Sequence, residues 1–272
     1  MNEALKKILY KSLKLLGIGI ILFRAEKNRD IVPFDRNELS KYLIPSEDYE
    51  LYKSASEAVT KKKSKPDSDI YKELRFFSLI QMVKFVLHNG VTGDFAECGC
   101  YRGHSSYIIS TLIKEKSATY KEFLIFDSFA GLSKRDRKLD KAKSTLDEKI
   151  INQEVGKFSC SEEEVKENLA AFNFIKFYKG WIPDRFTDVK QTKFCFVHID
   201  VDLYQPTYDA LSFFFPKLSI GGVIVIDDYG YSAYQGAELA VKHYLKDKSG
   251  FFFYAVPTGS AFILKSASHS KV

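Results

Sequence analysis

Two apolar runs of the sequence end in closely spaced carboxylates. The run "KFCFVHIDVD" ends in Asp200 and Asp202, and the run "GGVIVIDD" ends in Asp227 and Asp228. Carboxylates that converge without basic partners raise one another's pKa, and a divalent cation removes that conflict. Oxygen ligands favour Mg²⁺, Ca²⁺ or Mn²⁺ over a softer metal. We therefore predict a divalent-cation site at these four acids, with capping of the next helix or loop as the alternative role for any one of them.

A glycine turn lies upstream of the acids, in the segment "ECGCYRGHSS". Glu97 opens it, and the glycines at 99 and 103 let the backbone turn tightly and approach a ligand closely. The serines that follow open a helix, whose N-terminal amides favour an anionic group. Asp127 ends the next apolar run, thirty positions later (127 − 97), where an acid accepts hydrogen bonds from ribose hydroxyls. Together these residues predict a nucleoside cofactor; the alternative is that Asp127 only caps the turn that follows it.

Alternating strands and helices must position these residues. Strand patterns cover 93–99, 122–128, 174–180, 193–202 and 221–230, and helical patterns cover 71–90, 104–116, 161–172, 207–218 and 236–248. Such alternation is typical of an α/β fold with a mostly parallel sheet and helices on both faces, in which ligands bind beyond the carboxyl ends of the strands. Residues 251–265 are predicted to form a hairpin that adds an antiparallel edge, and residues 134–157 a charged, irregular insertion.

The composition indicates one sizeable domain with an accessory region. Of the 272 residues, 45% are hydrophobic and 15% aromatic, which excludes a disordered chain. The net charge of +6 is scattered along the sequence, so an anionic partner is permitted but not required. The sequence has no RNA-binding module and no basic-aromatic stripe, and we expect no nucleic-acid partner. The four cysteines lack a second pair at zinc spacing and indicate reduced thiols in a cytosolic protein.

Residues 1–68 form a helical N-terminal region in this interpretation. Its longest apolar run, at 15–23, is nine residues long, whereas a membrane-spanning helix needs about 20. Leucines and isoleucines recur at helical spacing between residues 5 and 16, with lysines between them. The pattern predicts an amphipathic helix that packs on the domain or on a dimer partner, or alternatively lies on an anionic membrane surface. We accordingly expect a cytoplasmic homo-oligomer, with peripheral contact at the inner face of the membrane as the alternative.

Six segments carry a resemblance to a known family. "GDFAECGCYRGHSS", "FDSFAGL", "GWIPDRF", "HIDVDLYQPTYDAL", "PKLSIGGVIVIDDYG" and "GAELAVKHY" occur in this order. Together they resemble the macrocin O-methyltransferase family, enzymes that use S-adenosylmethionine to methylate sugar hydroxyls of antibiotics and related glycosides. The resemblance covers roughly residues 70–265. It implies a Rossmann-like class I methyltransferase domain over residues 69–268, a bound Mg²⁺ and a small-molecule glycoside acceptor.

The resemblance also implies roles for particular residues. Asp200, Asp227 and Asp228 fall where the family's metal ligands lie. The family's cofactor motifs fall on Glu97, Gly99, Tyr101, Arg102, Gly103, Ser105, Ser106, Asp127, Ser128 and Phe129. Some members carry a histidine just before residue 161 as the proposed general base, but residues 134–160 here contain none. Asp202, which matches an acid proposed as the base in another member, is then the expected base.

The expected function is Mg²⁺-dependent transfer of a methyl group from S-adenosylmethionine to a hydroxyl of a sugar or glycoside in a natural product, glycolipid or surface polysaccharide. The alternatives are a catechol-like or other diol acceptor, a nucleic-acid methyltransferase and a non-catalytic cofactor-binding protein. Positions 69 and 70 hold Asp and Ile where the family often has a Thr-Met pair near the cofactor, which leaves the acceptor open. Trp181 either packs or lines the cleft, His104 is a candidate cofactor contact, and His198 is expected in the core.

Overall fold

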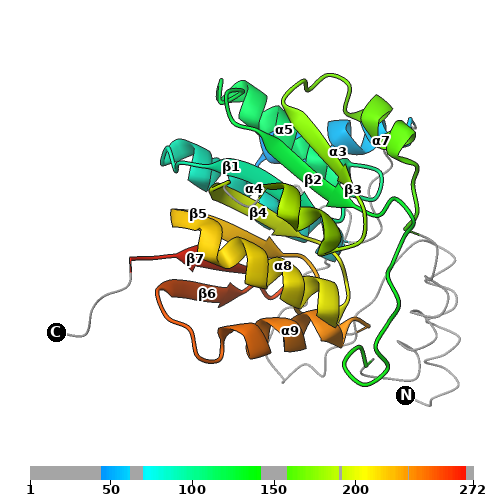
Figure 1. Ribbon diagram of the computed structural model, residues 1–272. Helices are drawn as coiled ribbons and strands as arrows, with labels where there is room; N and C mark the ends of the chain where they lie inside the picture. The colour runs from blue at the N-terminus through cyan, green and yellow to red at the C-terminus, as the bar shows by residue number, and fades with distance from the viewer. Residues whose placement is uncertain (1–43, 62–69, 142–157, 190–191, 232, 268–272) are drawn as a thin grey trace, which may run out of the picture.

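A seven-stranded sheet forms the centre of the protein in the computed structural model (Figure 1). The structure describes residues 44–61, 70–141, 158–189, 192–231 and 233–267. The amphipathic helix predicted between residues 5 and 16 and most of the predicted 134–157 insertion lie outside these ranges. The strand order is β3-β2-β1-β4-β5-β7-β6. The strands are β1 (Asp94–Cys98), β2 (Phe123–Asp127), β3 (Ile175–Lys179), β4 (Phe194–Ile199), β5 (Leu218–Ile226), β6 (Phe251–Ala255) and β7 (Ala261–Lys265).

The strand pairing confirms the predicted parallel sheet with an antiparallel edge. β1 to β5 pair in parallel, β7 pairs antiparallel with β5, and β6 pairs antiparallel with β7. The chain winds outward from β1 in one direction to β3, and then returns to start β4 on the other side of β1. The carboxyl ends of β1, β2, β4 and β5 therefore meet at one edge, at the point where the strand order reverses, which is where open α/β sheets bind ligands.

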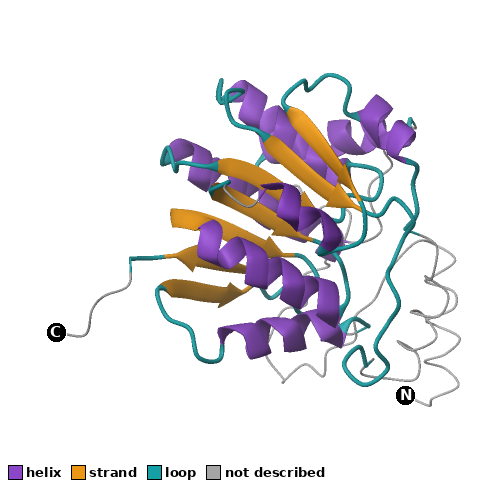
Figure 2. Cartoon of the chain, viewed as in Figure 1, coloured by secondary structure: helices purple, strands orange, loops and turns teal. Residues whose placement is uncertain are grey.

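Alternation along the strands builds a core on each face of the sheet (Figure 2). Phe95 and Ile125 point into one core, whereas their neighbours Ala96 and Leu124 point into the other. The first core is covered by α3 (Ser46–Thr60), α4 (Ile70–His88), α5 (His104–Glu115) and α7 (Glu162–Asn168). The second is covered by α8 (Tyr204–Lys217), α9 (Gln235–Leu245) and the 3-10 helix η1 (Asp184–Val189). Both faces of the sheet are thus shielded from water.

Helix α3 belongs to this core although it falls in the predicted accessory region. Its Tyr52, Ala55 and Val59 are buried in the same cluster as residues of α5 and β1. The described part of residues 1–68 is therefore packed on the sheet domain rather than set apart from it. Within the described residues, no helix is both long and apolar enough to cross a membrane.

Candidate active site

A cavity of about 430 Å³ lies beyond the carboxyl ends of β1, β2, β4 and β5. Its floor is formed by residues at or directly after the carboxyl ends of these four strands, including Gly99, Asp127, Asp200 and Asp227. Helices α3 and α4 close it from one side, where Arg75 is among the lining residues. These residues were predicted at the ends of separate strands, and they lie around one cavity.

Gly99 cannot be replaced by a larger residue in this turn. Its φ is +82°, in the left-handed region, and a Cβ there would lie 1.8 Å from the carbonyl oxygen of Asp200. The Gly99 amide also donates to the carbonyl of Phe126 at 2.9 Å, which ties the turn to β2. The glycine signal in the sequence therefore reports a close approach between the ends of β1 and β4. That approach forms the cavity floor.

Asp127 holds the glycine turn and faces the cavity at the same time. Its Oδ2 accepts from the Cys100 amide at 2.7 Å, and its Oδ1 accepts from the Phe129 amide at 2.7 Å. The second bond is the turn cap proposed as the alternative role for Asp127. The first is not local, since it joins β2 to the turn after β1. Each carboxylate oxygen keeps a second lone pair, so Asp127 can still accept hydrogen bonds from a ligand.

Four predicted cofactor residues, Glu97, Gly103, Ser106 and Phe129, do not line the cavity. Glu97 is fully buried; its Oε2 accepts from the Ser106 hydroxyl and its Oε1 lies 2.8 Å from Nδ1 of His198. Phe129 is buried in the core on the α5 side of the sheet. Burial opposes protonation of His198, but contact with Glu97 outweighs it and raises the pKa of His198. Glu97, Ser106 and His198 therefore form a buried polar cluster that joins the strand before the glycine turn to α5 and β4.

The remaining predicted cofactor residues lie on or beside the cavity wall. Those that line it are Gly99, Tyr101, Arg102, Ser105, Asp127 and Ser128. Gly103 instead begins α5 as its N-cap, with φ +88°. Ser105 is in the first turn of α5, where the backbone amides favour a negatively charged ligand group. His104 also lines the cavity; its Nε2 lies 3.0 Å from the carbonyl of Tyr52.

Three of the four acids form a compact cluster. Asp200, Asp202 and Asp228 each offer an oxygen within 4.8 Å of the others. Burial, and then the neighbouring carboxylates of Asp227 and Asp228, raise the pKa of Asp200 well above its ordinary value of 3.8. Burial and the charge of Asp227 raise the pKa of Asp228 to about 6. This is the carboxylate conflict that the sequence predicted.

Asp227 differs from the prediction, because it has a basic partner. Nη1 of Arg75, on α4, lies 2.8 Å from Oδ2 of Asp227 and 4.0 Å from Oδ1 of Asp228. The expectation of an acid cluster without a basic group is therefore wrong. Asp202 takes the place of Asp227 in the three-acid cluster, and the backbone amide of Asp202 donates to Oδ2 of Asp228 at 3.1 Å. Nothing in the α4 sequence marks Arg75 as a site residue, since it falls within none of the segments that carry the resemblance.

Aromatic side chains line the part of the cavity beyond the acids. Trp181 lines the cavity with 43% of its surface exposed, which favours the cleft-lining role over the packing role. Phe158, Tyr231 and Tyr234 line the same space. His198, by contrast, is 2% exposed and lies in the core, as expected. The cavity thus joins a polar turn, an acid cluster and an aromatic wall.

The chain belongs to the macrocin-O-methyltransferase (TylF) family, whose model matches residues 48–250. It is 29% identical over 168 residues to the 8-demethyl-8-(2,3-dimethoxy-alpha-L-rhamnosyl)-tetracenomycin-C 4'-O-methyltransferase of Streptomyces olivaceus, covering 60% of this chain and 63% of that protein. It is 27% identical to the demethyldecarbamoylnovobiocin O-methyltransferase of Streptomyces niveus, covering 57% and 60%. The chain thus spans less than two thirds of the length of these curated relatives.

Solved structures share the fold. The O-methyltransferase NovP superposes with a TM-score of 0.57 at 24% identity, covering 70% of this chain and 78% of that one. The calicheamicin methyltransferase CalS11 superposes with a TM-score of 0.60 at 17% identity, covering 89% and 99%. These likenesses confirm the predicted Rossmann-like class I fold.

Proposed function

We propose that this protein is an O-methyltransferase that moves the methyl group of S-adenosylmethionine to a hydroxyl of a sugar or glycoside. The observation that carries the proposal is the shared cavity, in which the turn at Gly99 and the carboxylate of Asp127 lie beside the cluster at Asp200. Family membership supports it. The names of two relatives support it as well: one is a 4'-O-methyltransferase of a rhamnosyl-tetracenomycin C, and another is the mycinamicin III 3''-O-methyltransferase.

The glycine-turn end of the cavity suits the cofactor. The free lone pairs of Asp127 would accept hydrogen bonds from the two ribose hydroxyls. Ser105 and the first amides of α5 would receive the carboxylate of the methionine part. When bound, the cofactor would supply an electrophilic methyl group: the acceptor oxygen bonds to the methyl carbon as the methyl–sulfur bond breaks, and S-adenosylhomocysteine leaves. The chain's contribution is to hold that oxygen in line with the methyl group, and orientation of this kind supplies much of an enzyme's rate.

The acid cluster would suit the predicted Mg²⁺, a hard divalent cation. All its donors are carboxylate oxygens, which Mg²⁺ prefers, and burial together with the neighbouring acids raises the pKa of Asp200 and of Asp228. Asp200 and Asp228 would hold the ion, with Asp227 as the third predicted ligand, and Asp202 lies beside them in the cluster. When bound, the ion supplies charge that lowers the pKa of a nearby hydroxyl.

Asp202 is the proposed general base. It lines the cavity and is only partly buried, and its backbone is fixed at φ +59° by the bond to Asp228. A carboxylate in this place can accept the proton of an acceptor hydroxyl. In the test, Asp202→Asn should leave cofactor affinity within about threefold and lower kcat by about 100-fold, which is the usual range for loss of a general base. A parental kcat would remove Asp202 from this role.

The aromatic wall supports a glycoside acceptor. Trp181, Tyr231 and Phe158 offer flat apolar faces, on which the C–H face of a sugar ring can pack while its hydroxyls remain free for polar groups. We further propose that the methyltransferase domain begins at α3 rather than at residue 69, because α3 supplies both core and cavity residues. Cytoplasmic location, homo-oligomerisation and membrane contact of the N-terminal region stay predictions.

Glycosides and catechols must be compared directly, because an acid-bound cation serves either acceptor. We expect the purified full chain to transfer labelled methyl groups to rhamnosyl or related deoxysugar glycosides and not to a simple catechol. Transfer should fall in excess EDTA and return with Mg²⁺. Full transfer in EDTA would show that the reaction needs no divalent cation. Preference for the catechol would show that the acceptor is a catechol-like diol and not a glycoside.

A further inference from the structure

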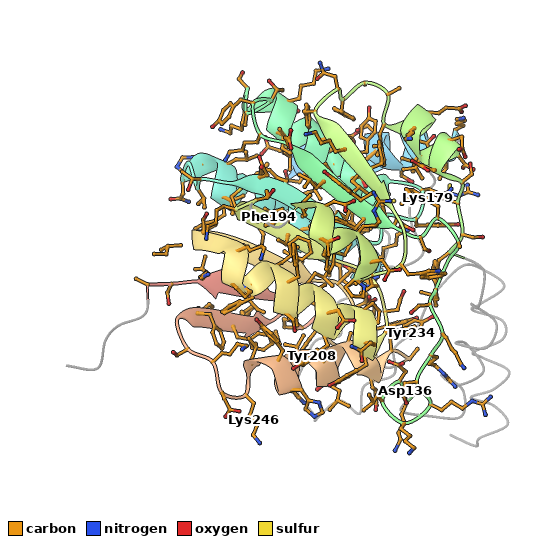
Figure 3. The ribbon with its side chains drawn as sticks, in the orientation of Figure 1. Asp136, Lys179, Phe194, Tyr208, Tyr234 and Lys246 are labelled. Atoms are coloured by element: carbon orange, nitrogen blue, oxygen red, sulfur yellow. The ribbon has the colours of Figure 1, made fainter. Side chains whose placement is uncertain are left out.

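Residues 128–141 form a loop, here called the crossing loop. It starts at the cofactor end of the cavity and reaches the ends of helices α8 and α9. Ser128, Gly131, Leu132 and Ser133 line the cavity as the loop leaves β2. The loop then runs, in green, down to the ends of α8 and α9 (Figure 1). Figure 3 shows Asp136 near its tip, on the same side of the molecule as Tyr234. The crossing loop therefore forms one wall of the cavity that the proposed acceptor would share with the cofactor.

The loop is anchored by a buried carboxylate that the proposed chemistry does not use. Asp140 is only 4% exposed. Its Oδ1 accepts from the backbone amide of Tyr204 at 2.6 Å, and its Oδ2 accepts from the amide of Asp136 at 2.8 Å. Burial raises the pKa of Asp140, whereas these two amides oppose the rise. Such a desolvated acid is retained in the fold although its burial is unfavourable.

Helix α8 lacks a local cap, and Asp140 replaces it. The N-cap position is Leu203, whose side chain makes no capping hydrogen bond. Helix N-termini need an acceptor for their first amides, which Ser, Thr, Asp or Asn usually provides from the N-cap itself. Asp140 provides it from 64 positions away. The fit is tight from the other side as well, since a Cβ on Gly236 of α9 would lie 1.9 Å from Oδ1 of Asp140.

The capped turn is the one that carries the catalytic acids. Tyr204 follows Asp202 by two positions, and the Asp202 amide is held by Oδ2 of Asp228 at 3.1 Å. The turn between β4 and α8 is thus fixed at Asp202 by the acid cluster and at Tyr204 by the crossing loop. Leu132 of the loop packs against the buried cluster that contains Leu203, which adds an apolar contact to the same turn.

We propose that Asp140 is a positioning residue that couples the acceptor wall to the catalytic turn. By holding Tyr204 it fixes the direction of the Asp202 carboxylate, and by ending the crossing loop it fixes Leu132 and Ser133 against the acceptor. The catalytic consequence rests on the proposed function, whereas the anchoring of α8 does not.

Three variants break the anchor in different ways. Asp140→Ala removes both acceptors. Asp140→Asn keeps one oxygen for the Tyr204 amide but presents an NH₂ group to the Asp136 amide, so that two donors face each other. Gly236→Ala leaves the Asp140 side chain in place and pushes a methyl group against both its Oδ1, at 1.9 Å, and the Tyr204 amide nitrogen, at 2.7 Å. Asp209→Asn is the matched control, because Asp209 also lies on α8 but contacts only the Gln205 amide group among the described side chains, at 2.9 Å.

Two readouts separate the anchor from the reaction. Hydrogen exchange of the full chain, followed on a peptide that covers residues 203–207, should become at least about 10-fold faster in Asp140→Ala and in Gly236→Ala, because the Tyr204 amide loses its acceptor. With a methylated acceptor in hand, kcat/KM for that acceptor should fall about 100-fold, as expected for a misplaced catalytic group, while cofactor affinity stays within about threefold. Asp140→Asn should give intermediate values of the exchange rate and of kcat/KM, and Asp209→Asn should match the parent in both measurements.

Parental exchange at 203–207 in Asp140→Ala would overturn the anchor whether or not the protein methylates sugars. Faster exchange with parental kcat and acceptor KM would overturn the positioning role while leaving the anchor. If no acceptor is methylated by the parent, the exchange result still decides the anchor, and the failure belongs to the proposed function. Should Asp140→Ala fail to fold, Asp140→Asn and Gly236→Ala carry the same comparison.

Discussion

Asp228→Asn should make the metal-free protein more stable while it weakens methyl transfer. Asp228 is 5% exposed, and its pKa rises from 3.8 to about 6 through burial and the charge of Asp227. At about 1.4 kcal/mol per pKa unit, ionising Asp228 at pH 8 costs the native state about 3 kcal/mol relative to the unfolded chain. Asparagine has nearly the same shape, can keep the acceptor for the Asp202 amide and carries no charge.

The pH dependence of this gain follows from the direction of the pKa change. The native state holds the Asp228 proton more tightly than the unfolded state, so the acid's unfavourable contribution is absent below pH 4 and grows as the pH rises to about 6. The variant should therefore match the parent near pH 4 and exceed it at pH 8. The pKa of about 6 already includes the attraction to Arg75, whose Nη1 lies 4.0 Å away, so the net gain is about 3 kcal/mol at most.

Urea unfolding in EDTA at pH 8 measures this difference, and thermal unfolding should show a rise of about 2–10 °C. Asp247→Asn removes a negative charge from an exposed turn and should change little. Added Mg²⁺ should stabilise the parent more than the Asp228→Asn variant, because a ligand that binds the native state stabilises it by mass action. Equal or lower stability of Asp228→Asn at pH 8 in EDTA would refute the account of a strained acid cluster.

Other substitutions test the remaining parts of the cavity. Gly99→Ala should lower the free energy of unfolding in urea by about 3 kcal/mol or more, because the φ of Gly99 and the Asp200 carbonyl both exclude a side chain. Gly90 has φ +59° and open space around it, so Gly90→Ala should lower the free energy of unfolding by only about 1 kcal/mol. Asp127→Asn should weaken S-adenosylmethionine binding about 10- to 100-fold by calorimetry, as expected for loss of a charged acceptor, and unchanged affinity would remove it from the cofactor site. Trp181→Ala should raise the acceptor KM and leave cofactor affinity unchanged; the reverse pattern would place it at the cofactor.

Much of the fold could be predicted from the sequence, because the strands are short apolar runs and the helices are amphipathic segments between them. The convergence of Asp127, Asp200 and Asp227 was also predictable. Parallel strands deliver their carboxyl ends to one edge, so acids that end several strands must meet there. The glycine at 99 was recognisable for the same reason, since a turn at that edge leaves little room beside the next strand.

The buried position of Glu97 was missed, although a signal for it was present. Side chains two apart on a strand share a face, and Glu97 follows the core residue Phe95 by two. That places its carboxylate under α5, where it meets Ser106, instead of beyond the strand end. The roles of Arg75 and Asp140 could not be predicted, because each reaches the site through tertiary packing of a helix or loop whose own sequence carries no motif.

Methyl transfer to a defined sugar hydroxyl tests the central claim most directly. The purified full chain would be incubated with S-adenosylmethionine, Mg²⁺ and a panel of deoxysugar glycosides, and the products analysed by mass spectrometry and by NMR of the new methyl group. We expect a product heavier by one methylene unit, with the methyl group on a sugar oxygen, that Asp202→Asn forms about 100-fold more slowly and that Asp127→Asn forms only at raised S-adenosylmethionine concentrations. A methyl group on nitrogen, carbon or a phenolic oxygen, or a product that Asp202→Asn forms at the parental rate, would contradict it.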